Sequence, residues 1–384
     1  STVTHLTAHV LQRAGIPTGF VSTVAEDVGR GVEGNASGLT TAGAPALQAA
    51  LATMVAEGRR AAVLEASSHA LDQDRVAACE FDVAAFTQVG HDHLDYHGTW
   101  ARYLAAKAKL VELCREGAAK GVPKTAVLNR DDRSYARLAE HPIERRFAYT
   151  LGEEAADLRA SEVQREIAAT SFRLHAAGAS VPVRLPMPGL FNVANALCSA
   201  GICLAFGVPP ETIALALGDF PGVPGRLERV DRGQPFAVYV DYAHAAESLA
   251  SALAELRAVT KGRLLAVFGC SDRSDGHDPE GMGRSAARGA DWFCITTDDP
   301  VDTDPAELAR RVADGARSTG RGSWEVELDR ARAIELAIEH AGPDDTVLLA
   351  GKGHERFMMV AGRRREPWDE RGAAAAALHR RGWG

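Results

Sequence analysis

The chain has 384 residues, of which 46% are hydrophobic and 24% charged, a composition typical of a globular protein. This length exceeds what a single hydrophobic core usually supports, so we expect two domains. The net charge of -8 argues against the basic face that nucleic-acid binding requires. The sequence contains no stretch that approaches the roughly 18 consecutive apolar residues of a membrane span.

The six cysteines are scattered along the chain and form no CxxC pair. This spacing favours reduced, buried thiols over a disulfide framework or a zinc site. We therefore expect a cytoplasmic protein. We also expect a monomer that binds neither nucleic acid nor a membrane.

Helices and short strands alternate through the first part of the chain, as the spacing of the apolar residues indicates. In chain order we expect a helix (1–14), a strand (19–24), an exposed Gly-, Ser- and Thr-rich loop (27–43), a helix (45–58), two strands (61–64 and 82–88), a helix (100–116) and a strand (125–129). An alternating pattern then predicts a hairpin (171–185), followed by two apolar helices (191–206 and 210–217).

The Gly- and Pro-rich segment 221–225 indicates a hinge between domains. After it, four predicted strands alternate with helices, with the strands at 236–241, 263–269, 292–297 and 346–350. Such a series of β-α-β units predicts a doubly wound domain. The expected fold is therefore α/β: a mostly parallel sheet domain over 1–224 and a Rossmann-like domain over 225–384.

Polar side chains gather where the strands at 61–64 and 83–86 end. Buried core positions would need a partner for each of them, so the cluster favours a ligand site at a sheet edge. Its members are Glu65, Ser67, Ser68, His69, His91, Asp92, His93, Asp95 and His97. A carboxylate such as Glu65 near an imidazole suits Mg²⁺, although Glu65 taken alone fits a helix-capping residue equally well.

The strands of the second domain also end in polar residues. These fall at 241–244, 271–273, 298–299 and 351–355. Two sheets with polar carboxyl edges predict that substrates are brought together from both domains.

Eight short motifs stand out along the chain, at 65–71 (EASSHAL), 92–98 (DHLDYHG), 105–107 (AAK), 128–132 (LNRDD), 191–197 (FNVANAL), 225–228 (GRLE), 241–244 (DYAH) and 351–355 (GKGHE). Together, and in this order, they resemble the motifs of the Mur ligases, ATP-dependent amide-forming enzymes of peptidoglycan synthesis. The resemblance is strongest to the branch that adds the third peptide residue. The resemblance implies an ATP-binding domain over 1–224 and an amino-acid-binding domain over 225–384.

The resemblance also implies roles for individual residues. Glu65 and His93 would hold Mg²⁺ together with Ser1, and a carbamylated Lys107 would hold a second Mg²⁺. Arg226 would act with them in catalysis. Nucleotide contacts would come from Ser1, Thr2, Asn192, Asn195, Arg226 and Asp241. The UDP-muramyl dipeptide would be bound by Thr40, Thr41, Ser67, Ser68 and Arg75, and the incoming amino acid by Arg273, Asp298, Asp299, Gly351 and Glu355. The resemblance assigns no role to His69, His91 and His97. We expect these side chains to pack or to hydrogen-bond the binding residues rather than to bind a metal.

Residues 298–301 (DDPV) indicate which amino acid is added. Family members that add meso-diaminopimelate have Asp-Asn-Pro-Arg here, with the arginine binding the distal carboxylate. Val301 cannot pair with a carboxylate, and Asp298, Asp299, Asp302 and Asp304 make the segment acidic. We therefore expect L-lysine or L-ornithine rather than diaminopimelate; the alternative is that these aspartates form a solvated loop.

The chain also departs from the family pattern. Ser1 and Thr2 align with the residues just after the lysine of the family's phosphate loop, so we expect that an upstream segment, including the N-terminal domain, has been removed or lies outside this sequence. Ala42 and Ala246 replace prolines, Gln88 and His91 replace Asn and Arg, and the loop near Arg273 lacks a usual Lys-Arg-Pro.

Two other functions remain open on the sequence alone. One is a folate- or cyanophycin-type polyamide ligase of the same superfamily, which the EASSHAL motif and Arg75 disfavour. The other is a non-catalytic paralogue that serves as a scaffold, which the retention of Glu65, His93 and Lys107 disfavours.

Overall fold

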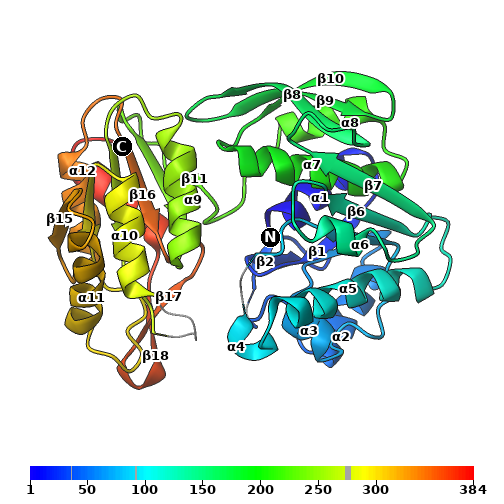
Figure 1. Ribbon diagram of the computed structural model, residues 1–384, viewed down its shortest axis with the longest axis horizontal. Coiled ribbons are helices and arrows are strands. Elements are labelled where there is room, and N and C mark those ends of the chain that lie inside the picture. Colours follow the sequence, from blue (N-terminus) through cyan, green and yellow to red (C-terminus); the bar gives the residue numbers. More distant parts are fainter. Residues whose placement is uncertain (36, 91–92, 273–277) are drawn as a thin grey trace. The chain divides into compact units, whose positions relative to one another are not determined.

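The chain folds into two α/β units in the computed structural model, which describes residues 1–35, 37–90, 93–272 and 278–384 (Figure 1). The first unit consists of Ser1–Gln164 and Ala169–Pro221, and the second of Arg165–Ala168 and Gly222–Gly384. The α/β class predicted from the sequence is confirmed. The boundary between residues 224 and 225, and the roles assigned to the two domains, stay predictions.

Two sheets form the first unit. In the smaller one, β1 (Thr18–Val21) runs parallel to β4 (Ala61–Leu64). The larger sheet has the order β10-β9-β8-β7-β6-β5, and β5 (Val83–Phe86) runs parallel to β6 (Thr125–Asn129). The two strands that precede the polar cluster thus belong to different sheets. The remaining strands are β2 (Ala25–Asp27), β3 (Glu33–Gly34), β7 (Arg145–Thr150), β8 (Leu158–Arg165), β9 (Thr170–Ala176) and β10 (Ala179–Leu185).

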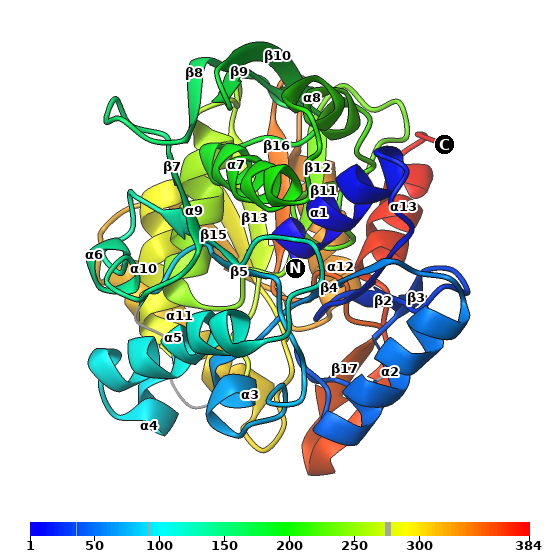
Figure 2. The same ribbon diagram turned by 90° about the vertical axis from the view of Figure 1, so that its right-hand side faces the viewer.

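Helix α1 lies beside α7 in both views (Figures 1 and 2). Their apolar faces are buried, and Thr7 donates a 3.1 Å hydrogen bond to Ser199 across this contact. Thr99 caps α5 by accepting from the Arg102 amide, which fixes where that helix begins. The helices of this unit are α1 (Thr2–Arg13), α2 (Ala44–Ala56), α3 (Ser68–Asp72), α4 (Leu94–His97), α5 (Trp100–Glu116), α6 (Tyr135–Leu138), α7 (Leu190–Ala205) and α8 (Pro210–Gly218).

The second unit is built on one six-stranded sheet with the order β11-β12-β16-β13-β14-β15. Its central strands are apolar along their whole length because helices cover both faces. All neighbours are parallel except the edge strand β11 (Glu228–Arg229). The parallel strands are β12 (Ala237–Asp241), β13 (Leu264–Phe268), β14 (Trp292–Ile295), β15 (Ser323–Val326) and β16 (Thr346–Ala350).

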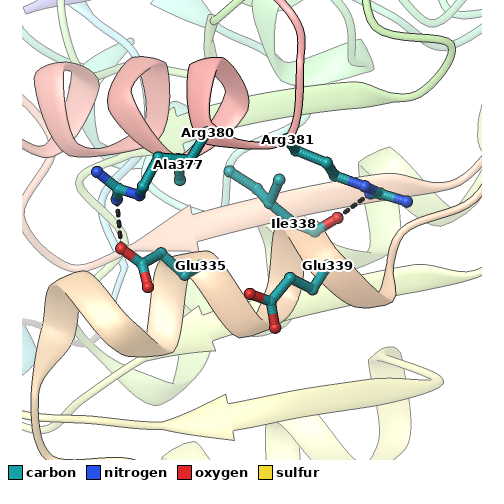
Figure 3. Close-up of a pocket in the computed structure, with 6 residues that line it drawn as sticks. All are labelled: Glu335, Ile338, Glu339, Ala377, Arg380 and Arg381. Carbon is teal, nitrogen blue, oxygen red and sulfur yellow. Dashed lines mark hydrogen bonds and ion pairs between the residues drawn. The ribbon is translucent and has the colours of Figure 1, made fainter.

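Helix α10 (Pro279–Gly289) packs against both α9 (Ala246–Arg257) and α11 (Pro305–Arg317), and α12 (Arg330–His340) packs against α13 (Glu370–Arg380). A hairpin of β17 (Phe357–Val360) and β18 (Arg364–Pro367), joined by the short helix η1 (Ala361–Arg363), follows β16. A pocket of about 250 Å³ lies between α12 and α13, where Arg380 pairs with Glu335 and Arg381 donates to the Ile338 carbonyl (Figure 3). These two contacts link α13 to α12 at the protein surface.

Gly225 fixes how the chain enters the second unit. Its φ is +66°, and a Cβ atom there would lie 2.1 Å from the backbone nitrogen of His354. Only glycine fits such a contact. Among the described residues, no helix is long and apolar enough to cross a membrane.

Candidate active site

The Glu65 carboxylate follows β4 and accepts two hydrogen bonds. Ser1 Oγ donates to it at 2.9 Å, and the Thr23 amide donates at 2.8 Å. Hydrogen bonds of this kind favour the charged form of a carboxylate. Glu65 therefore places carboxylate oxygens beside the hydroxyl oxygen of Ser1.

Thr41 joins Glu65 to the start of α3. Its hydroxyl donates to the Glu65 carbonyl at 2.8 Å and accepts from the Ser67 amide at 3.0 Å. Arg75 in turn donates to the Thr41 carbonyl at 3.1 Å. Thr40, the neighbouring residue, accepts from the Thr23 hydroxyl at 3.0 Å. Four of the residues expected to bind substrate, Thr40, Thr41, Ser67 and Arg75, are thus linked by hydrogen bonds to Glu65 or its surroundings.

A group of aromatic rings surrounds His93, at the start of α4. His93 has a left-handed φ of +53°, which is unusual for a residue with a side chain. Its ring centroid lies 4.7 Å from that of His69 and 6.2 Å from that of Tyr103. The Lys107 ammonium lies 4.9 Å from the centre of the Tyr103 ring. The structure therefore brings His93 and Lys107 to the same aromatic group.

His97 belongs to this group and contacts an expected substrate residue. Its Nε2 lies 3.1 Å from the hydroxyl of Ser68, and both side chains are buried. Burial, together with the positive charges of His93 and Lys107, lowers the pKa of His97, although Asp72 opposes this. His97 thus has a hydrogen-bonding role, one of the two roles that the sequence left open.

Two further residues reach this site that the sequence did not single out. Gln73 accepts from the Arg75 guanidinium at 3.0 Å and donates to the Tyr96 hydroxyl at 3.3 Å. Tyr96 donates to Asp72 at 3.1 Å. Gln73 lies two residues before Arg75 on the turn after α3. This closeness in sequence was the one sign by which it could have been predicted as a site residue.

Asn192 and Asn195 lie on α7 in the first unit and differ in exposure. Asn192 is 1% exposed, donates to the Pro188 carbonyl at 2.8 Å and accepts from Asn195 at 3.3 Å. Asn195 is half-buried. Asn192 is therefore in a position to orient Asn195 rather than to meet a ligand directly.

In the second unit, Asp241 ends β12 and shapes the segment that carries Arg226. Its carboxylate accepts from the Leu227 amide at 2.8 Å and from the Ala243 amide at 2.9 Å. Burial raises the pKa of Asp241 against these hydrogen bonds and the charge of Arg226. The Arg226 guanidinium lies 4.7 Å from the centre of the Tyr242 ring.

The loops after β14 and β16 meet around Lys352. Its ammonium lies 2.7 Å from Asp299 and 2.6 Å from Glu355. Asp298, Asp299 and Val301 are all at most 3% exposed. The two aspartates therefore do not form the open acidic surface that the sequence indicated, because they are buried beside a lysine.

Gly351, the first residue after β16, has a φ of +114°, and a Cβ there would lie 2.1 Å from Asp298 Oδ2. The close approach of the two loops thus requires glycine. Arg273, the remaining residue expected to bind the amino acid, lies outside the described residues, as do His91 and Asp92.

The donor atoms near Glu65 suit a hard cation. The Glu65 carboxylate and the Ser1 hydroxyl both supply oxygen, and Mg²⁺ needs only one or two protein ligands because it retains waters. Within the described part of the chain, no three His, Cys, Asp or Glu side chains are grouped to hold a metal. The donors therefore fit a water-rich magnesium site better than a site made of protein ligands alone.

Two family models and several known proteins match this chain. Residues 1–203 match the Mur ligase middle domain, and residues 225–353 match the Mur ligase glutamate ligase domain. The chain is 40% identical to the UDP-N-acetylmuramoyl-L-alanyl-D-glutamate--2,6-diaminopimelate ligase of Thermosynechococcus vestitus, over 99% of this chain and 75% of that protein. It is 39% identical to the UDP-N-acetylmuramyl-tripeptide synthetase of Deinococcus radiodurans, over 99% of this chain and 76% of that protein.

A solved structure of a UDP-N-acetylmuramoyl-L-alanyl-D-glutamate--2,6-diaminopimelate ligase superposes with a TM-score of 0.69 at 27% identity, over 99% of this chain and 76% of that one. Fold and sequence together define an ATP-dependent ligase that forms amide bonds in peptidoglycan synthesis. The chain belongs to the Mur ligase family, as its motifs predicted.

Proposed function

We propose that this ligase joins a diamino acid to UDP-N-acetylmuramoyl-L-alanyl-D-glutamate through an acyl phosphate. The γ-phosphoryl group of ATP passes to the substrate carboxylate, and ADP leaves. The amine then attacks the acyl carbon, the new C–N bond forms, and phosphate departs as the nitrogen loses a proton. The names of the relatives support this substrate, because they specify the same UDP-linked dipeptide.

One observation carries the proposal: the hydrogen-bonded link from Ser1 and Glu65 through Thr41 to Ser67 and Arg75. It places an anion with a neighbouring hydroxyl next to a buried hydroxyl, a serine and a guanidinium. Phosphoryl transfer depends mainly on positioning and electrostatic stabilisation. An oxygen-rich centre beside donors for a carboxylate is the arrangement that this chemistry needs.

Magnesium would be held by Glu65 and Ser1, with His93 and a carbamylated Lys107 as further ligands. When bound, Mg²⁺ supplies positive charge that offsets the charge on the transferring phosphoryl group. The carbamate would change Lys107 from a cation into an oxygen ligand. Tyr103, which packs against both His93 and Lys107, would hold the two side chains in place.

Each unit carries residues that the family motifs assign to the nucleotide. In the first, Asn195 would contact the adenine while Asn192 orients it, and Ser1 and Thr2 would lie near the phosphates. In the second, Arg226 would pair with the phosphates, and Asp241 would accept from the ribose. The hydrogen bonds from Asp241 to Leu227 and Ala243 fix the loop on which Arg226 sits.

We propose L-lysine or L-ornithine as the amino acid. The support is Val301, which offers no partner for a distal carboxylate and lies buried in the loop that follows β14. The burial of Asp298 and Asp299 beside Lys352 weakens the part of the argument that rested on local acidity. Meso-diaminopimelate is the second candidate, because relatives with 37–40% identity are named as ligases for it.

The test is phosphate release from ATP by the protein expressed with the sequence that its gene encodes upstream of Ser1. Each assay contains UDP-N-acetylmuramoyl-L-alanyl-D-glutamate and one amino acid: lysine, ornithine or meso-diaminopimelate. We expect turnover with lysine or ornithine at least tenfold above diaminopimelate, since a buried valine gives a carboxylate no pairing partner. Equal or faster turnover of diaminopimelate would overturn the specificity. Failure with all three would overturn the proposed reaction and favour the scaffold.

A further inference from the structure

Lys352 is the most deeply buried charged side chain among those that the structure describes in the loops after β14 and β16. Its side chain is 0% exposed. The ammonium lies 2.7 Å from Asp299 Oδ1 and 2.6 Å from Glu355 Oε2, and Asp298 Oδ1 lies 3.9 Å away. A lysine at such a position is held by its carboxylates, because an unpaired buried charge is very costly.

The two close carboxylates come from different loops. Asp299 lies in the segment after β14 and has a left-handed φ of +42°. Glu355 lies in the turn after β16, three residues beyond Lys352. Asp299 also accepts from the Met359 amide at 2.7 Å, so the same carboxylate reaches the start of the β17–β18 hairpin. Lys352 therefore joins three backbone segments at one sheet edge.

Three carboxylates surround the Lys352 ammonium. They belong to Asp298, Asp299 and Glu355, while the nearby Arg330 pairs with Glu370 at 2.7 Å. Asp298 Oδ2 is buried and accepts no hydrogen bond. Burial would lower the pKa of Lys352, but the carboxylates of Asp298, Glu355 and Asp299 raise it. The lysine therefore stays charged beside its close partners.

We propose that Lys352 is a positioning residue of the amino-acid site. Its ammonium holds the Asp299 and Glu355 carboxylates in fixed positions and neutralises part of their charge. The inference rests on the proposed function and on the amino-acid-binding role that the family motifs imply for Asp299 and Glu355. Lys352 itself is fully buried and acts through those two side chains. Its loss frees both carboxylates to move and makes the site more negative.

A purely structural role is the rival explanation, and the neighbouring pair Arg330 and Glu370 illustrates it. That pair is buried and bidentate, and Arg330 also donates to the Ala350 carbonyl, so it holds α12, α13 and β16 together. Lys352 differs because both of its close partners are side chains expected to meet substrate. The two explanations predict different kinetics, since a structural lysine would alter stability without singling out one substrate.

The decisive variant is Lys352→Met, which keeps an unbranched side chain, one atom shorter, and removes its charge. The Michaelis constant of the enzyme is measured for ATP, UDP-muramyl dipeptide and amino acid separately. We expect the amino-acid KM to rise about tenfold or more, with the other two within about twofold, because only one substrate's contacts are disturbed. We also expect diaminopimelate, with its additional carboxylate, to be disfavoured further relative to lysine.

Arg263→Met is the matched control. Arg263 pairs with Asp345 at 2.9 Å, at the opposite end of the same sheet. We expect this variant to lose stability in thermal unfolding and to keep all three KM values. A KM for amino acid that is unchanged in folded Lys352→Met, or that rises equally in Arg263→Met, would overturn the inference.

Lys352→Arg decides the matter if Lys352→Met does not fold. It keeps the buried charge, but a planar guanidinium cannot reproduce both contacts of the ammonium. A raised amino-acid KM with an unchanged ATP KM supports the inference, and three unchanged values overturn it. Failure of the proposed function is seen separately, because the unaltered enzyme would then form no amide with any amino acid.

Discussion

The two ends of the strands carry charged residues of different kinds. At the amino ends, each charge is matched: Lys124 meets Asp82 at 3.0 Å beside β5 and β6, and Arg263 meets Asp345 beside β13 and β16. At the carboxyl ends, several carboxylates gather at one place: Glu65 lies there in the first unit, and Asp298, Asp299 and Glu355 surround Lys352 in the second. Ligands of open parallel sheets bind at the carboxyl ends.

The difference separates stability from function. The amino-end pairs also bond to backbone, as when Lys124 donates to the Phe81 carbonyl at 2.7 Å and Asp345 accepts from the Gly342 amide at 2.9 Å. Such groups are complete without a ligand. The carboxyl-end groups include Asp298 Oδ2, which is buried without a hydrogen bond. Substitutions at the amino ends should therefore lower stability, and those at the carboxyl ends should lower activity.

The largest effect is expected for Glu65→Gln. The change keeps the shape of the side chain but removes the anion, so turnover should fall on the order of 1,000-fold, because charge stabilisation dominates phosphoryl transfer. Phosphate release at saturating ATP measures this. Thermal unfolding should show a folded protein. A loss of less than about tenfold would place the metal-binding role elsewhere.

Carbamylation of Lys107 should be visible without any assay of turnover. We expect protein equilibrated with ¹³C-bicarbonate to show a carbamate signal by NMR that disappears in Lys107→Arg, because guanidinium does not form this adduct under such conditions. The paired control is Lys109→Arg. Lys109 lies two residues further along α5, and this variant should keep the signal. A signal that survives in Lys107→Arg would contradict the assignment.

Specificity should shift in the double variant Asp299→Asn/Val301→Arg. The arginine offers a bidentate partner for a distal carboxylate, so the preference for lysine over diaminopimelate should fall by about tenfold or more. The measurement is the ratio of kcat/KM for the two amino acids. Asp299→Asn/Val301→Leu is the control, since it adds volume at the buried position without charge. An identical ratio in both variants would mean that another residue sets specificity.

The smallest effect on turnover is expected at the amino end, for Asp345→Asn. Burial would raise the pKa of Asp345, but hydrogen bonds from Gly342 and Arg263 lower it below its ordinary value of 3.8. Its stabilisation is thus present above that pH and is lost as the pH falls through the lower folded value. We expect a loss of about 2 kcal/mol at pH 7.

Denaturant unfolding of both proteins between pH 7 and pH 3 checks the Asp345 prediction. The difference in unfolding free energy should shrink as the pH approaches 3, while kcat at pH 7 stays unchanged. A loss of turnover without a loss of stability would remove the distinction between the two ends of the sheet.

Much of the fold followed from the sequence because the central elements are strongly apolar. The strands at 125–129 and 346–350 and the helix at 100–116 were predicted with their observed bounds. The strands β7, β8 and β15 were missed. β7 begins with two exposed arginines, and β15 is an edge strand whose residues are mostly exposed, so neither has the apolar run that marks a buried strand.

The site was predicted less completely, for physical reasons. The motifs identified Glu65, Thr41, Ser67 and Arg75, which the structure joins by hydrogen bonds. They did not predict that Lys352 would neutralise Asp299, because a lysine 53 positions away in the chain gives no local sign of its partner. Contacts between loops of different strands depend on the register of the sheet, which sequence patterns alone do not supply.

Gly225 has a mechanical consequence. With no room for a Cβ between it and His354, the start of the second unit is locked to the turn that carries Lys352 and Glu355. Residues 225–228 and the turn at 352–355 must therefore move together. A bulkier residue at 225 would push the two segments apart.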